Sequence, residues 1–118
     1  MTATDADATD PVVNLLARAQ AGAPGTAWAY GGTDLNVNLL VFTAGEGVAA
    51  HVNTEVDVLL IGILGEGVVI VDGGEHRVGA GQALVIAKGA QRAIRATSDR
   101  FAYLTCHRRR ARLWPEGA

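Results

Sequence analysis

The sequence predicts an all-β domain, built as a sandwich or a barrel, on two observations. Short apolar segments recur at intervals of roughly 8–12 residues, and glycine-rich turns separate them. The chain also has 15 glycines among 118 residues, well above the usual ~7%, and glycine supplies the positive φ angles that tight turns need. Because 49% of the residues are apolar and only 5% are aromatic, we expect an aliphatic core.

A short helix is expected ahead of the strands, in the segment DPVVNLLARAQAG. Asp10 can cap this helix, Pro11 suits its first turn, and Gly22 would end it. Residues 1–10 are acidic and contain no apolar block that could be buried, so we expect them to form a disordered leader. Residues 11–118 are then long enough to form a single domain with its own core.

The strands are expected in the segments DLNVNLLVF, VDVLLIGIL, VVIVDGGEHRV, ALVIA, RAIRA and FAYLTCHRRR, with a hairpin turn at the Asp-Gly pair. The stretch VLLIGIL has no polar residue, so both faces of that strand should be covered. A neighbouring sheet, the N-terminal helix or a second subunit could cover its outer face. We expect a homodimer, because two-fold dimers are the commonest assembly of small domains.

The net charge and the cysteine content limit which binding partners and which cellular compartment we expect. The net charge of −2 predicts no long-range attraction to nucleic acid or to anionic membranes. The basic tail from Arg108 to Arg112 is interpreted as a solvated strand edge. The single cysteine, Cys106, cannot form an internal disulfide, and neither a signal peptide nor a membrane-spanning segment is visible, so we expect a cytoplasmic location.

Two segments carry glycines and hydrophobic residues in a pattern known from other proteins. The first runs from Gly45 to Gly67, and the second is GAGQALVIAKGAQR at residues 79–92, with a VDG turn between them. Together they resemble the two motifs of the cupin superfamily, over roughly residues 35–107. The resemblance implies a double-stranded β-helix, also called a jelly-roll barrel.

The resemblance also implies a metal site, because cupins use three histidines and one carboxylate to bind a divalent transition metal inside the barrel. Matched residue by residue, His51 falls on the first histidine and Asp57 on the acid. The other two histidine positions carry Asn53 and Arg92. Two of the three imidazole ligands that the resemblance implies are therefore replaced.

The residues at these positions still predict a pocket. Side chains two residues apart in a strand share a face, so the segment from His51 to Asp57 can direct several polar groups inward. An inward-pointing guanidinium would repel a divalent ion by on the order of 8 kcal/mol at about 4 Å and an effective dielectric near 20. It could instead pair with a carboxylate of the chain, or bind a carboxylate or phosphate of a ligand. We therefore predict a binding pocket that contains His51, Asn53, Glu55, Asp57 and Arg92.

Three functions remain open from the sequence. The leading hypothesis is a small-molecule binding module for an anion, with no cofactor or only a weakly bound divalent metal, and with unknown catalytic residues. The second is a metal-dependent oxygenase or isomerase, as the resemblance implies, with His51 and Asp57 as ligands and with Glu55 and His107 as possible additions. The third is a structural or regulatory dimer whose barrel is filled by side chains.

Overall fold

The computed structural model describes residues 10–109, so the predicted leader lies outside the described residues except for Asp10. The described residues form one short helix and nine strands, which confirms the predicted all-β class with an N-terminal helix. In chain order the elements are α2 (Leu15–Ala21), β1 (Gly25–Gly31), β2 (Leu35–Thr43), β3 (Gly47–Val52), β4 (Val58–Leu64), β5 (Glu66–Val71), β6 (Gly74–Gly79), β7 (Ala83–Ile86), β8 (Gln91–Ala96) and β9 (Arg100–Arg108).

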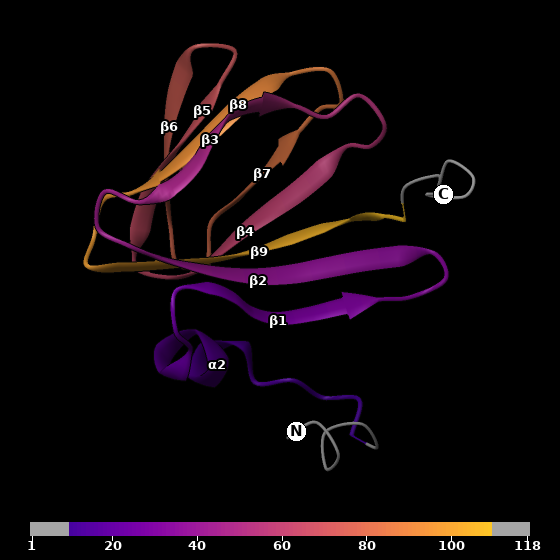
Figure 1. Cartoon of the computed structure of the whole chain (residues 1–118), viewed down its shortest axis with the longest axis vertical. Coiled ribbons are helices and arrows are strands. Elements are labelled where there is room, and N and C mark those ends of the chain that lie inside the picture. Colours follow the sequence, from indigo (N-terminus) through magenta and orange to yellow (C-terminus); the bar gives the residue numbers. More distant parts are fainter. Residues whose placement is uncertain (1–9, 110–118) are drawn as a thin grey trace.

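The strands form two antiparallel sheets that face each other (Figure 1). The five-stranded sheet has the order β1-β2-β9-β4-β7, and the four-stranded sheet has the order β3-β8-β5-β6. The chain crosses repeatedly from one sheet to the other, so that the C-terminal strand β9 lies between β2 and β4. This is the jelly-roll arrangement that the sequence predicts.

Tightly packed side chains fill one end of the space between the sheets. Leu60, Val69, Phe101 and Tyr103 are at most 1% exposed there, and the ring centroids of the two aromatic residues lie 5.3 Å apart. Gly67 on β5 permits this packing, because a Cβ atom at that position would lie 2.4 Å from atoms of the Phe101 ring. The aromatic end of β9 is thus anchored in a filled core.

Helix α2 begins later than the sequence analysis predicts. Its N-cap is Asn14, whose side-chain oxygen accepts a 3.0 Å hydrogen bond from the Ala17 N–H. Asp10 was the wrong choice of cap; its carboxylate accepts from the Val12 N–H at 2.9 Å, in a turn ahead of the helix. Both side chains can cap a helix. With Asn14 as the cap, the first helical residue is Leu15, which packs against the cluster that contains Ala19. Gly22 follows the last helical residue, as predicted.

The helix covers part of the outer face of the five-stranded sheet (Figure 1). Ala19 is fully buried there against Leu39, Val41 and Ala102. The apolar strand β4 also contacts the helix, so one of the three covers considered for that strand is present. Coverage is incomplete, since Leu59 of β4 remains 36% exposed.

Two strands, β1 and β3, lie where the sequence analysis names no strand. In β1 a register shift between Thr26 and Trp28 interrupts the alternation of apolar residues on which a strand prediction depends. In β3, whose sequence is GVAAHV, small residues prevail and most positions are exposed, so an apolar pattern is lacking. Backbone pairing rather than local preference forms these strands: β1 pairs with the next strand, β2, as a hairpin, and β3 pairs with β8, which is distant in the sequence.

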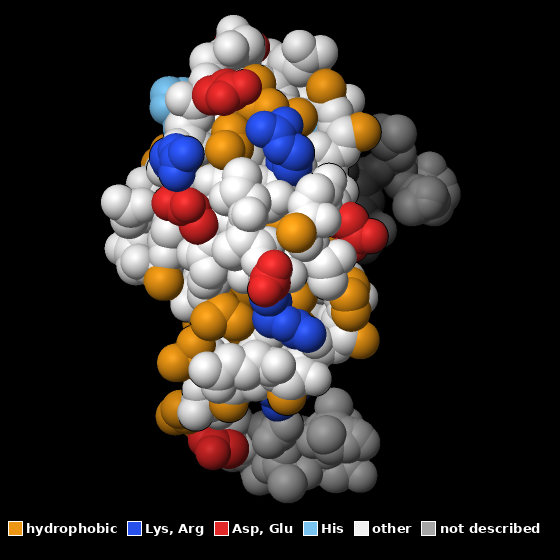
Figure 2. All heavy atoms as spheres, turned by 90° about the vertical axis from the view of Figure 1, so that its left-hand side faces the viewer, with side chains coloured by type: hydrophobic (Ala, Val, Ile, Leu, Met, Phe, Trp, Pro, Cys, Tyr) orange, Lys and Arg blue, Asp and Glu red, His pale blue; other side chains and the backbone are white. Residues whose placement is uncertain are grey.

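The surface carries charges of both signs. Figure 2 shows acidic and basic side chains interspersed on one face of the molecule, with apolar side chains between them. The exposed pair Arg77 and Glu66 is one example, with 3.3 Å between the guanidinium and carboxylate atoms. Within residues 10–109, no helix combines the length and the apolar character needed to cross a membrane.

Candidate functional site

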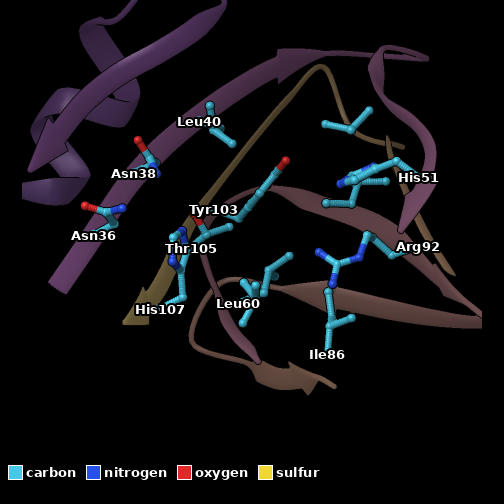
Figure 3. A pocket seen from close by; sticks show the side chains of 13 residues that line it. Asn36, Asn38, Leu40, His51, Leu60, Ile86, Arg92, Tyr103, Thr105 and His107 are labelled. Atoms are coloured by element: carbon cyan, nitrogen blue, oxygen red, sulfur yellow. The ribbon is translucent and has the colours of Figure 1, made fainter. Parts of the chain in front are cut away.

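A cavity of about 350 Å³ lies between the two sheets, beyond the filled core (Figure 3). Strand pairing explains which side chains reach it, because directly opposed residues of two neighbouring strands point to the same face. His51 of β3 is opposite Arg92 of β8 in the four-stranded sheet. Aliphatic side chains from both sheets form much of the wall: Leu40, Val48, Val58, Leu60, Ile86 and Ile94.

Arg92 gives this cavity a permanent positive charge. Its side chain is only 5% exposed, although guanidinium stays protonated at any ordinary pH. Alternation along β8 turns Arg92 and Ile94 into the cavity and leaves Arg95 exposed on the other face. The described residues that line the cavity include no Asp or Glu, so its field favours an anion.

His51 also lines the cavity but is exposed. Its Nδ1 atom lies 3.0 Å from the carbonyl oxygen of Ala49. A carbonyl can only accept, so Nδ1 carries the hydrogen, and in the neutral ring Nε2 is left as an acceptor. The ring therefore offers a lone pair when neutral and a donor when protonated.

The other three residues of the predicted pocket lie elsewhere. Asn53 and Glu55 line a separate hollow of about 250 Å³ beside His51, in the loop that follows β3. The Asn53 side-chain oxygen accepts the Glu55 N–H at 2.9 Å, and the Asn53 carbonyl accepts the Gly89 N–H at 2.7 Å. Asp57 is exposed and accepts the Lys88 N–H at 2.9 Å. These contacts join the loop before β4 to the turn before β8.

Sequence reasoning missed four polar residues of the cavity wall. Asn36 and Asn38 extend from β2, and Tyr103 and Thr105 extend from β9 (Figure 3). For the asparagines the signal was present, because alternation in DLNVNLLVF places them on the face opposite to Leu35, Val37 and Leu39. The sequence does not say which of the two faces points inward. His107, considered for a reduced metal site, lines the same part of the cavity.

Tyr103 occupies the boundary between the filled core and the cavity. It is 1% exposed, and its ring lies against those of Phe101 and Phe42, with centroids at 5.3 Å and 6.1 Å. Burial raises the pKa of its hydroxyl well above the ordinary value, because the phenolate would lose its hydration. The hydroxyl therefore stays protonated and can donate a hydrogen bond into the cavity.

These side chains do not fit a cupin-type transition-metal site. Within residues 10–109, no group of three or more His, Cys, Asp or Glu side chains lies close enough together to hold a metal ion. Asp57 does not line the cavity, and the position of a third histidine carries a guanidinium, which has no lone pair to give. The donors that remain are two imidazoles, His51 and His107.

Comparison with protein-family models gave no match, and neither did comparison with curated proteins. Solved structures do resemble this chain. A cupin protein from Bacteroides fragilis shares 28% identity and a TM-score of 0.61, over 65% of this chain and 67% of that chain. A protein from Bacillus halodurans reaches a TM-score of 0.76 at 19% identity, over 87% of this chain and 86% of that one.

An RmlC-like cupin family protein with a double-stranded β-helix fold, from Methanocaldococcus jannaschii, also matches. Its TM-score is 0.65 at 17% identity, over 76% of this chain and 85% of that chain. The chain therefore has the double-stranded β-helix fold of the cupin superfamily, as its glycine and hydrophobic pattern predicts. Its cavity differs from the metal site that the pattern implies.

Proposed function

We propose that this chain is a cupin-fold module that binds a small organic anion in the cavity between its sheets, without a tightly bound transition metal. Arg92 carries the proposal, since it adds a permanent charge to a cavity whose described lining residues include no Asp or Glu. A guanidinium presents donors in a planar fork that matches a carboxylate or phosphate group. Inside a barrel, such a contact is screened less than at the surface.

The size and lining of the cavity support a ligand over a barrel filled by side chains. At about 350 Å³ it exceeds the lower limit of roughly 300 Å³ for small-molecule sites. Its wall combines aliphatic surface with a few convergent polar groups, which is the usual composition of such sites. A purely structural barrel would leave no reason for polar side chains to converge there.

The metal-dependent enzyme remains the second candidate, because two imidazoles, of His51 and His107, face one cavity. The charge of Arg92 argues against it, and so does the position of Asp57, whose carboxylate is engaged by the Lys88 N–H. We therefore assign no catalytic step to this chain.

We also propose that two copies associate through the outer face of the five-stranded sheet. Large apolar side chains are exposed on that face, including the part of it beside the helix. Exposed apolar patches of this kind mark sites where proteins associate. They include Tyr30 at 52%, Leu35 at 42%, Leu59 at 36% and Val85 at 65%. Cys106 lies on the same face as a free thiol, which fits the cytoplasmic location that we propose.

A calorimetric titration tests the binding proposal. Small monocarboxylates and inorganic phosphate would be titrated into the intact chain, with the corresponding uncharged amides as controls. Arg92→Gln is expected to weaken binding of the anions by about 100-fold, because it removes a charge-assisted pair. Arg95→Gln, on the same strand but outside the cavity, is the matched control and should leave binding unchanged.

The same protein preparation tests the proposal that no transition metal is tightly bound. Elemental analysis of chain purified without chelators is expected to find less than about a tenth of an equivalent of transition metal, since tight sites retain their ion through purification. A stoichiometric metal, or anion binding that survives Arg92→Gln unchanged, would count against the proposed function.

A further inference from the structure

The cavity has two chemically different ends on opposite sheets. Arg92 and His51 belong to the four-stranded sheet, whereas a polar cluster of Asn36, Asn38, Thr105 and His107 belongs to the five-stranded sheet (Figure 3). Facing sheets are usually about 10 Å apart. Leu60 of β4 lies between the labelled side chains of the two ends in Figure 3, and Ile86 of β7 also lines the cavity. One ligand can therefore reach both.

Strand register brings the polar cluster together. Asn36 is opposite His107, and Asn38 is opposite Thr105, in the pairing of β2 with β9. Directly opposed residues hold their Cβ atoms about 5 Å apart, so the four side chains form a compact square on the inner face. The cluster contains no permanently charged side chain.

The hydrogen-bonding capacity of this cluster is mixed. The His107 Nδ1 atom lies 2.8 Å from the Arg108 carbonyl oxygen, so Nδ1 carries a hydrogen and the neutral ring presents Nε2 as an acceptor. The Thr105 hydroxyl both donates and accepts, and so do the asparagine amides. A group that both donates and accepts, above all a hydroxyl, can satisfy such neighbours. A second carboxylate would find no permanent cation here, and an ammonium would find no carboxylate.

On this basis, and resting on the proposed function, the geometry points to the class of ligand. We propose that the cavity binds a monocarboxylate whose carbon skeleton separates the carboxylate from a hydroxyl group at its far end. Arg92 binds the carboxylate, the aliphatic wall covers the skeleton, and the polar cluster binds the hydroxyl. The cluster thereby acts as a specificity subsite.

The test uses six-carbon ligands: four carboxylates that differ only at the far end, and a diol that lacks the carboxylate. Hexanoate, 6-hydroxyhexanoate, 6-aminohexanoate, adipate and 1,6-hexanediol would each be titrated into the intact chain by calorimetry. The hydroxy acid is expected to bind about tenfold more tightly than hexanoate, the gain of one or two buried hydrogen bonds. The amino acid, the diacid and the diol should bind more weakly than the hydroxy acid.

Variants assign the preference to the cluster. Thr105→Val keeps the shape of the side chain and removes its hydroxyl, so it should cancel most of the preference for the hydroxy acid and leave hexanoate binding unchanged. Thr105→Ser should restore the preference, and Asn38→Leu provides a second, independent variant. Arg92→Gln should weaken both ligands alike. Thermal melts of each variant confirm that it is folded before titration.

The outcomes separate the two proposals. If hexanoate and 6-hydroxyhexanoate bind equally, or if Thr105→Val leaves their ratio intact, the hydroxyl subsite is overturned while anion binding stands. If neither the carboxylates nor inorganic phosphate bind, the proposed function falls and the ligand class falls with it; binding of phosphate alone would overturn only the ligand class. Tighter binding of adipate or 6-aminohexanoate would also overturn the assignment, because the cluster would then recognise a charge.

Discussion

The inner and outer faces of the five-stranded sheet carry different kinds of side chain. On the inner face, β2 and β9 present Asn38 and Thr105 to the cavity. On the outer face the same strands present Val37, Leu104 and Cys106. A domain with one filled core usually has the reverse, an apolar inner face and a wet outer face. This distribution supports the two proposals, a polar ligand in the interior and a second copy of the chain on the exposed part of the outer face.

The largest effects on the free energy of unfolding are expected from substitutions on the inner face. Phe101→Ala, at the filled end of β9, is expected to lower the free energy of unfolding by about 3–5 kcal/mol, because it leaves a void in a packed core. Asn38→Ala, at the hollow end, should cost less than about 1 kcal/mol, since the cavity already lies beside it. Urea denaturation measures both. Equal losses would mean that the inner face is packed alike at its two ends.

The outer face is tested by placing a charge on it. Leu59→Glu should raise the dissociation constant of the proposed dimer at least about tenfold, since a buried carboxylate without a partner costs more than 1.4 kcal/mol. Analytical ultracentrifugation of the two proteins over a range of concentrations measures it. His76→Glu, exposed on β6 of the other sheet, is the control and should not change association. A monomeric parent chain would contradict the proposed dimer directly.

A third substitution tests how the helix is held on the outer face. The Arg100 guanidinium donates to the carbonyls of Ala19, at 3.0 Å, and Gly22, at the C-terminal end of α2. Arg100→Ala should lower the free energy of unfolding by about 1–2 kcal/mol, because two helix-end carbonyls lose a charged donor. Arg95→Ala removes an exposed arginine from β8 and should change it by less than about 0.5 kcal/mol. Similar losses in both would show that the helix is held by apolar packing alone.

Much of the barrel could be predicted from sequence, because glycine turns and apolar segments are local signals. The segments that include β4, β5 and β6 were expected near their observed positions. The positions of β1 and β3 could not be predicted. A register shift interrupts the alternation of β1, and β3 lacks an apolar pattern and pairs with the distant strand β8. The helix cap was also missed, because Asp10 and Asn14 are equally good caps and only tertiary packing selects between them.

The candidate site was harder to predict than the fold. Motif positions placed His51 and Arg92 in one pocket, and both line the cavity. The same reasoning grouped Asp57 with them, but the chain bends after β3, where two-residue alternation no longer applies. The inward direction of Asn36 and Thr105 could not be read from alternation, because alternation is symmetric between the two faces of a strand.

The smallest predicted effect concerns Tyr103, where the packed and hollow parts of the inner face meet. Burial raises the pKa of its hydroxyl in the folded chain, while in the unfolded chain the pKa stays near its ordinary value of about 10. Below that value both states are protonated and stability does not depend on this group. As pH rises above it, only the unfolded state loses the proton, so stability falls by up to about 1.4 kcal/mol per pH unit.

Urea denaturation between neutral pH and pH 11 compares the parent chain with Tyr103→Phe. The variant should lose less stability above pH 10 than the parent, because the exposed Tyr30 is present in both and only the buried phenol differs. Parallel curves would mean that the Tyr103 hydroxyl ionises freely in the folded chain. In that case water reaches the Tyr103 hydroxyl, and the boundary between the packed core and the cavity lies nearer to Phe101.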